Sequence, residues 1–195
     1  MKTTEKRYVG CLVDGLSLDV ADGGPLGLSW DIIGRPFTAA AIGSAVVSGS
    51  QDYLTHAQLA TFQLDAQSYN NRLLSMTMKN NMQDAFEGGS RNLARGEFGP
   101  LDITGELGIR YTTQGILDDF LAETARKLTA TFTGGTLGAG NYQLKIEIDH
   151  VVLKAAGAHI NKQEQVVQTV PFEAKQNGTN PIIQATLIDG ISSYA

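Results

Sequence analysis

Alternation of apolar and polar residues is the feature that most constrains what this chain can fold into. Residues 16–20 read Leu-Ser-Leu-Asp-Val, and residues 26–32 read Leu-Gly-Leu-Ser-Trp-Asp-Ile. Successive side chains of a β-strand point to opposite faces, so each run predicts a strand with one apolar face. Residues 21–25, Ala-Asp-Gly-Gly-Pro, lie between the two runs and are typical of a turn. The first thirty residues therefore predict a β-hairpin after an opening strand.

The second half of the chain repeats this pattern and contains one helical signal. Ile116, Leu117, Phe120 and Leu121 form a single apolar stripe, which predicts an amphipathic helix. We expect eight or nine strands and one helix in a single domain over residues 1–195, folded as a mainly β sandwich or barrel. Two polar or glycine-rich stretches, 83–99 and 134–140, predict loops. The further predicted strands cover 74–78, 101–111, 128–132, 142–148, 166–174 and 183–187.

Residues 35–70 interrupt the alternation and predict an extended loop or arm. The stretch from Ala39 to Ser50 is small and apolar without a clear period, and the stretch from Gln51 to Tyr69 is mostly polar. Loops this long in compact domains are usually functional or disordered. We expect the arm to become ordered against another subunit, and an ordinary excursion containing one short strand is the alternative. The candidate contact residues of the arm are Thr38, Ile42, Val46 and Tyr53.

Composition excludes several classes of protein. The chain has 15 Lys and Arg against 20 Asp and Glu, a net charge of −5, whereas a protein that coats DNA should be basic. A single cysteine excludes an internal disulfide framework and a four-cysteine metal site.

No apolar run approaches the roughly 18 residues of a membrane-spanning helix. The apolar run after the basic N-terminus is too short for a signal peptide, so we expect synthesis and retention in the cytoplasm, with no membrane partner.

No arrangement of residues predicts catalysis, a cofactor or a metal centre. The glycine-rich stretch 134–140 lacks the Lys-Ser/Thr of a phosphate-binding loop and joins two predicted strands. The three histidines, His56, His150 and His159, have no metal-ligand spacing. His150 follows Asp149, but neighbouring strand residues point to opposite faces, so we expect no pairing between them. We therefore expect a protein without enzymatic activity and without a cofactor.

Two predicted strands carry acidic residues on their polar faces. Asp102 and Glu106 lie on one strand, and Glu147 and Asp149 lie on another, beside Lys145. A solvated sheet face explains either pair without any function. The alternative depends on what the sheet surrounds, since an acidic wall repels the phosphates of nucleic acid.

Five stretches, taken in order, resemble the tail tube proteins of long-tailed bacteriophages. Each stretch is short, but together they extend over nearly the whole chain, and residues 38–70 resemble that family least. The five stretches are Tyr8–Val20, Gly23-Gly24 with Leu28–Arg35, Leu74–Asn81, Asp102–Leu107 with Leu117–Leu121, and Val170–Ala174.

The resemblance implies a structural virion protein. Such a fold is a β-sandwich or barrel whose inner sheet joins those of its neighbours, so that six copies form a ring with a continuous inner β-barrel. Stacked rings would form the hollow tail tube that conducts DNA without binding it specifically. The implied partners are further copies of the chain, the tape measure protein, the tail terminator, and baseplate or tail-tip proteins. Asp102, Glu106, Glu147 and Asp149 are then candidates to face the lumen.

Two other functions remain open on the residues alone. A carbohydrate-binding or receptor-binding β-sandwich of a virion would carry clustered aromatic residues on an exposed face, whereas this chain has one tryptophan, Trp30. A hydrolase on a β scaffold would need a catalytic arrangement, which the sequence does not indicate. Electron microscopy of the purified protein distinguishes these functions, because only the tube subunit should form rings.

Overall fold

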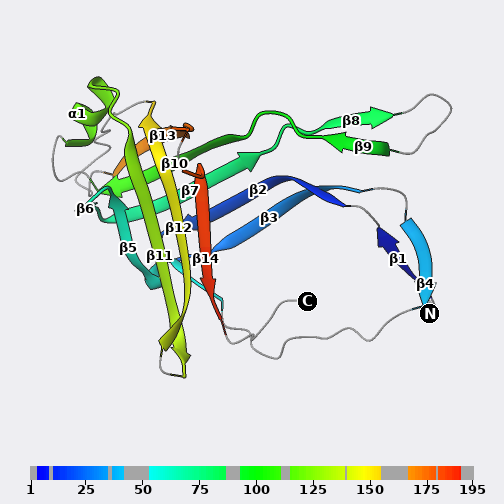
Figure 1. Cartoon of the computed structure of the whole chain (residues 1–195). Helices are drawn as coiled ribbons and strands as arrows, with labels where there is room; N and C mark the ends of the chain where they lie inside the picture. The colour runs from blue at the N-terminus through cyan, green and yellow to red at the C-terminus, as the bar shows by residue number, and fades with distance from the viewer. Residues whose placement is uncertain are drawn as a thin grey trace. The chain divides into compact units, whose positions relative to one another are not determined.

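The computed structural model of the chain is mainly β, with one short α-helix (Figure 1). It describes residues 4–8, 11–34, 37–41, 53–86, 93–110, 115–138, 140–154, 167–178 and 180–189. The elements are β1 Thr4–Tyr8, β2 Leu12–Ala21, β3 Gly27–Ile33, β4 Phe37–Ala41, the 3-10 helix η1 His56–Gln58, β5 Leu59–Leu64, β6 Gln67–Ser68, β7 Asn71–Lys79, β8 Gln83–Phe86, β9 Leu93–Glu97, β10 Asp102–Arg110, α1 Gly115–Leu121, β11 Arg126–Leu137, β12 Gly140–Leu153, β13 Val167–Ala174 and β14 Ile183–Ile188.

The main sheet has two ends, so it is not closed into a barrel. Its strands hydrogen-bond in the order β3-β2-β7-β10-β13-β12-β11-β5-β6, and β14 pairs with β12. The β12 strand is long enough to pair with β14 along residues 143–148 and with β13 along residues 151–153. The prediction of a mainly β fold with one helix is confirmed. A barrel within one chain is wrong, because the described strands leave β3 and β6 as the ends of the sheet.

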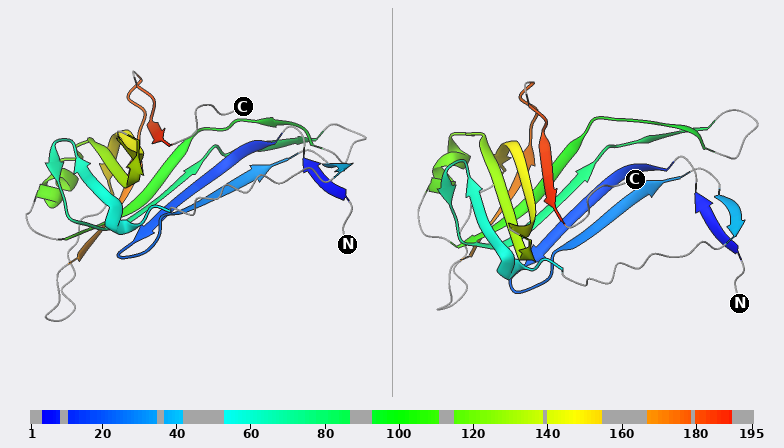
Figure 2. Two further views of the ribbon diagram at one scale, coloured as in Figure 1. Left: turned by 90° about the horizontal axis from the view of Figure 1, so that it is seen from below. Right: turned by 60° about the horizontal axis from the view of Figure 1, so that its bottom comes forward.

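The chain divides into two compact units. Unit 2 comprises residues 18–27, 52–77 and 103–195, and it holds every apolar side chain that is buried in the described part of the chain. Figure 2 shows β14, in red, beside the yellow strand β12 in both views. The core forms where alternate side chains of β5, β7, β10, β11, β12 and β13 meet. Its largest fully buried side chains include Phe132, Phe172, Leu64, Ile103, Leu107, Ile109, Leu128 and Ile148.

Unit 1 comprises residues 1–17, 28–51 and 78–102. It contains two small antiparallel pairs, β1 with β4 and β8 with β9, together with β3 and the ends of longer strands. Among its described side chains, no apolar one is buried. Within unit 1, side-chain burial is described for residues 11–17, 28–34, 78–83 and 97–102, and these contribute no buried apolar side chain.

Several local predictions are confirmed. The hairpin of β2 and β3 turns at Asp22-Gly23, where Gly23 has a φ of 74° that favours glycine. The helix α1 covers the predicted apolar stripe, and Ile116 is its buried residue. The strands predicted near 142–148, 166–174 and 183–187 are β12, β13 and β14.

Two predicted loops are wrong. Residues 83–99 contain the hairpin of β8 and β9, although the polar sequence of this stretch hides its strands. In the glycine-rich stretch, β11 continues to Leu137 and β12 begins at Gly140, so the turn is confined to the residues between them. Gly138 in that turn has a φ of 54°. Backbone pairing along the sheet overrides the low strand propensity of glycine here.

Part of the predicted arm, residues 35–70, is regular structure. The β5 strand pairs with β11, and β6 pairs with β5, so this portion belongs to unit 2. The β4 strand places Thr38 opposite Arg7 of β1. Ile42 and Val46 lie outside the described residues. The role of the arm between subunits stays a prediction.

Candidate assembly surfaces

The first candidate acids, Asp102 and Glu106, lie on the solvent face of β10. Both side chains are exposed, whereas Ile103 and Leu107 on the opposite face are buried. The amide nitrogen Nδ2 of Asn81 donates a hydrogen bond of 2.6 Å to Asp102. Among the residues that the structure describes, neither acid forms an ion pair. The strand therefore presents two negative charges that remain uncompensated.

Neighbouring strands of unit 2 extend the polar face around Glu106. On β2, Asp19 is exposed, and it accepts a hydrogen bond from the hydroxyl of Ser75 on β7. On β13, Glu173 lies opposite Thr104, and it is paired with Lys154. That lysine holds the pKa of Glu173 below its ordinary value. In unit 2, Asp19 and Glu106 are the acids of this face that no cation neutralises within the described residues.

The other candidate acid on β12, Glu147, is neutralised by two lysines. Its carboxylate lies 2.7 Å from Nζ of Lys127 and 3.0 Å from Nζ of Lys145. Hydrogen bonds from Lys127 and then Lys145 lower the pKa of Glu147, and the same contact raises the pKa of Lys127. The Glu147 side chain is only 17% exposed. These contacts are typical of a structural ion-pair cluster on the sheet.

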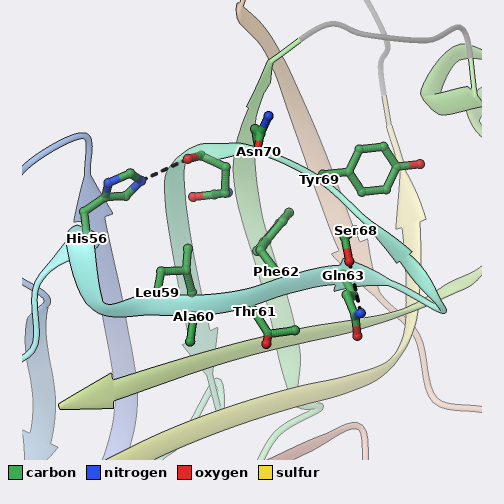
Figure 3. Close-up of a pocket in the computed structure, with 10 residues that line it drawn as sticks. His56, Leu59, Ala60, Thr61, Phe62, Gln63, Ser68, Tyr69 and Asn70 are labelled. Carbon is green, nitrogen blue, oxygen red and sulfur yellow. Dashed lines mark hydrogen bonds between the residues drawn. The ribbon is translucent and has the colours of Figure 1, made fainter.

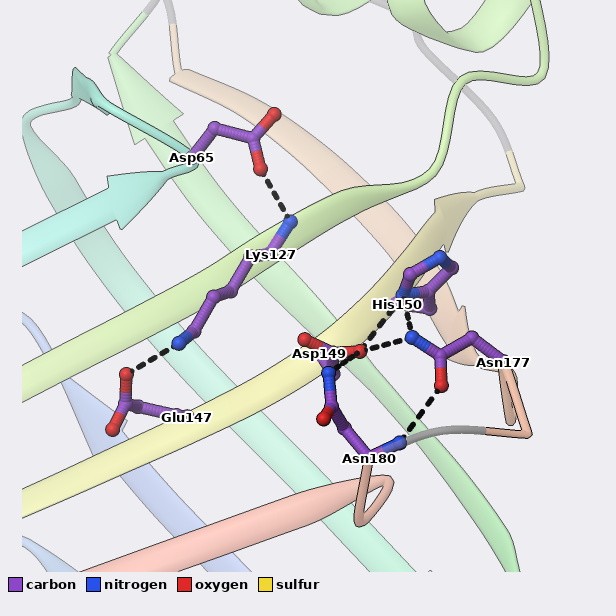
Figure 4. A network of polar contacts seen from close by, with 7 residues as sticks. All are labelled: Asp65, Lys127, Glu147, Asp149, His150, Asn177 and Asn180. Atoms are coloured by element: carbon purple, nitrogen blue, oxygen red, sulfur yellow. Dashed lines mark hydrogen bonds and ion pairs between the residues drawn. The ribbon is translucent and has the colours of Figure 1, made fainter.

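The last candidate acid, Asp149, is bound within a polar cluster that sequence reasoning missed (Figure 4). Its carboxylate accepts hydrogen bonds from the side-chain amides of Asn177 and Asn180, the latter over 3.2 Å. Nδ1 of His150 lies 3.2 Å from the same carboxylate oxygen. The prediction that Asp149 and His150 do not pair is therefore wrong.

A β-bulge in β12 explains that error. Leu128 and Arg126 of β11 lie two residues apart, yet they oppose Ile148 and Val151, which lie three residues apart. The extra residue shifts the alternation, so that Ile146 and Ile148 are buried before it, and Val151 and Leu153 after it. A bulge is set by pairing with the neighbouring strand, and its one trace in the sequence is the pair of consecutive polar residues, Asp149 and His150, that interrupts the alternation.

Three apolar residues of β3 form an exposed apolar surface in unit 1. Leu28, Trp30 and Ile32 are 51%, 55% and 60% exposed. Alternate residues of a strand lie on the same face, so these three side chains share one face and Asp31 lies on the other. The carboxylate of Asp31 lies beside Gly15 of β2, where a built Cβ would be 2.8 Å from it. The outer edge of β3 pairs with no described strand. We call Leu28, Trp30 and Ile32 the β3 apolar face.

The β14 strand is a second edge with exposed apolar side chains. Leu187 and Ile188 are 60% and 46% exposed, and β14 pairs with β12 on one side only within the described residues. Tyr53, a candidate residue of the predicted arm, is also exposed in unit 2. Unpaired strand edges are templates for pairing with another chain.

A pocket of about 360 Å³ opens beside β5 in unit 2 (Figure 3). His56 and Tyr69 lie at opposite ends of it, and burial raises the pKa of Tyr69. Nε2 of His56 lies 3.0 Å from the backbone oxygen of Asn71, and Oδ1 of Asn71 is buried without a hydrogen-bond partner in the described residues. The remaining lining residues are Leu59, Ala60, Thr61, Phe62, Gln63, Ser68 and Asn70.

The described residues also contain no cluster of three or more His, Cys, Asp or Glu side chains that could hold a metal ion. None of the helices in the described ranges has the length and apolarity needed to cross a membrane.

Comparison with known families identifies the family to which this chain belongs. A family model described as phage tail tube protein matches residues 1–174, which is most of the chain. The chain belongs to the phage tail tube protein family. A search of curated protein sequences finds no match. The resemblance inferred from five short stretches is thereby confirmed, and a tail tube protein is a structural component of the virion.

Proposed function

We propose that this tail tube protein assembles into stacked hexameric rings, which form the hollow tube that delivers phage DNA to the host. The match of residues 1–174 to the tail tube family carries the proposal. The open sheet supports it, because the exposed edges of β3 and β14 are a hazard in a lone subunit and are satisfied when neighbouring copies pair. Sheets shared around a ring would supply the barrel that one chain lacks.

Electron microscopy of the purified full-length protein tests the assembly. We expect rings or tubes about 10 nm wide, a width that follows from six domains of ordinary size around a channel. A protein that stays monomeric at high concentration, and also when it is produced together with other tail proteins, contradicts the proposal. The proposed partners beyond the chain itself are the tape measure protein, the tail terminator, and the baseplate or tail-tip proteins.

We further propose that Asp102 and Glu106, rather than Glu147 and Asp149, face the lumen. Asp102 and Glu106 are exposed and form no ion pair among the described residues, whereas lysines neutralise Glu147 and a polar cluster binds Asp149. Six copies of an uncompensated carboxylate would form a ring of negative charge. Such a ring repels the phosphates of DNA and keeps it from adhering to the wall.

The double variant Asp102→Lys/Glu106→Lys tests the lumen assignment. We expect tubes to form, because solvated surface changes shift stability little. DNA release from virions built with the variant should slow, and more at low salt, because salt screens the new attraction to phosphate. The matched control is Asp118→Lys/Glu123→Lys, which makes the same charge change at exposed residues at α1 and just after it. Equal release rates for both variants contradict the assignment.

A further inference from the structure

The β3 apolar face is large and apolar for a strand at the edge of a sheet. Leu28, Trp30 and Ile32 are each more than half exposed, and the alternate residues Ser29 and Asp31 are polar and exposed as well. An edge strand that stays in water is usually protected by charge, by proline or by short length. This strand is seven residues long, and its apolar face carries no charge. Its composition therefore fits a surface that is covered in the working protein.

We propose that the β3 apolar face is the surface on which a second copy of this chain docks, with Trp30 as its central contact. This inference rests on the proposed function, since it names the contact by which tube subunits join. It also adds what that function does not specify, namely which strand and which side chains bear the contact.

A second copy is the occupant that this chain fits best. A head-to-tail contact, which builds rings and stacks, needs two different surfaces on each subunit. The chain has two such surfaces, the β3 apolar face in unit 1 and the edge of β14 in unit 2, which carries Leu187 and Ile188. The apolar side chains of both surfaces are 46–60% exposed. A tryptophan flanked by aliphatic side chains is also typical of the buried centre of a protein interface.

Trp30 allows a direct test, because it is the only tryptophan of the chain and its fluorescence reports this face alone. In the free subunit we expect emission typical of an exposed tryptophan and efficient quenching by acrylamide. On assembly, followed by sedimentation, the emission maximum should move to shorter wavelength and quenching should fall. Tubes in which Trp30 is quenched as strongly as in the free subunit overturn the docking proposal while leaving the tube function intact.

Two variants of one strand separate docking from a general effect of charge. Ile32→Lys places a cation on the β3 apolar face, and Ser29→Lys places the same cation on the opposite face. Both positions are exposed, so both variants should keep the thermal unfolding midpoint of the wild-type subunit. We expect Ile32→Lys to lose assembly and Ser29→Lys to retain it. Assembly of Ile32→Lys at the wild-type concentration overturns the proposal.

The remaining outcomes identify other occupants. If Trp30 is already shielded in a monomer at every dilution, a segment of the same chain covers the face, and the proposal is wrong. A particle that stops at two copies shows a self-complementary contact instead of a head-to-tail one, and it contradicts the tube function as well. A chain that never assembles, with Trp30 exposed throughout, overturns both the docking proposal and the proposed function.

Discussion

Unit 2 and unit 1 are both built from antiparallel strands, yet only unit 2 buries apolar side chains in the described part of the chain. In unit 2, Phe132, Leu107 and Ile148 are fully enclosed. In unit 1, Leu28, Trp30 and Ile32 of β3 are each more than half exposed. Because burial of apolar surface is the dominant favourable contribution to folding, unit 2 should fold by itself. The stability of unit 1 should depend on contacts with other copies.

The largest expected effect compares a core residue of unit 2 with an exposed residue of unit 1. Phe132→Ala should lower the free energy of unfolding by about 3–5 kcal/mol, because it removes a fully buried aromatic side chain and leaves a cavity. Leu28→Ala should change it by less than about 0.5 kcal/mol in the free subunit, because Leu28 is half exposed. Urea denaturation at a concentration where the chain is monomeric measures both. A similar decrease in the free energy of unfolding for the two variants would contradict the claim that only unit 2 has an apolar core in the described residues.

A second prediction concerns close packing of the backbone within unit 2. A Cβ on Gly105 would lie 2.2 Å from the carbonyl oxygen of Ser75 and 2.6 Å from the ring of Phe172. Gly105→Ala should therefore cost about 1–3 kcal/mol, as overpacked cores do. Gly135→Ala is the control, since a Cβ there meets nothing within 4 Å. Thermal unfolding of both variants checks the difference, and a stable Gly105→Ala protein would show that β10 and β7 can move apart.

The smallest effect is expected at the ion-pair cluster of Glu147. Glu147→Gln should lower the free energy of unfolding at neutral pH by about 0.5–1 kcal/mol, because its lysine partners are partly exposed. The pKa of Glu147 is lowered in the folded protein, so its contribution is fully present above the ordinary glutamate pKa of about 4.3. That contribution is lost as pH falls through the lowered pKa.

Glu106→Gln is the matched control for that pH dependence, because Glu106 has no ion pair in the described residues. Denaturant unfolding between neutral and acidic pH should show a difference between wild type and Glu147→Gln that shrinks toward zero in acid. The corresponding difference for Glu106→Gln should stay near zero throughout. A constant loss at all pH values for Glu147→Gln would indicate a packing effect rather than an electrostatic one.

Alternation predicted the local elements well, because it reports directly on which face of a strand is apolar. It located the hairpin of β2 and β3 and the strands β12 to β14, whereas the helix α1 was located by its amphipathic apolar stripe. It missed the hairpin of β8 and β9, because residues 83–99 are polar and contain several glycines. A stretch without a period of two in its apolar residues resembles a loop.

Contacts between distant segments could not be predicted from the sequence. The pairing of Lys127 with Glu147 depends on the register between β11 and β12, and the pairing of Asp149 with His150 depends on the bulge in that register. The two acidic pairs looked equivalent in the sequence. Only their surroundings in the fold distinguish the exposed acids of β10 from the bound acids of β12.

Amide hydrogen exchange of the full-length chain, free and assembled, tests the central comparison most directly. The account predicts that amides of β11 and β12, in the core of unit 2, are strongly protected in both states. Amides of β3 should exchange quickly in the free subunit and gain protection on assembly, because neighbouring copies cover that strand. Strong protection of β3 in the free subunit, equal to that of β11 and unchanged by assembly, would contradict the account.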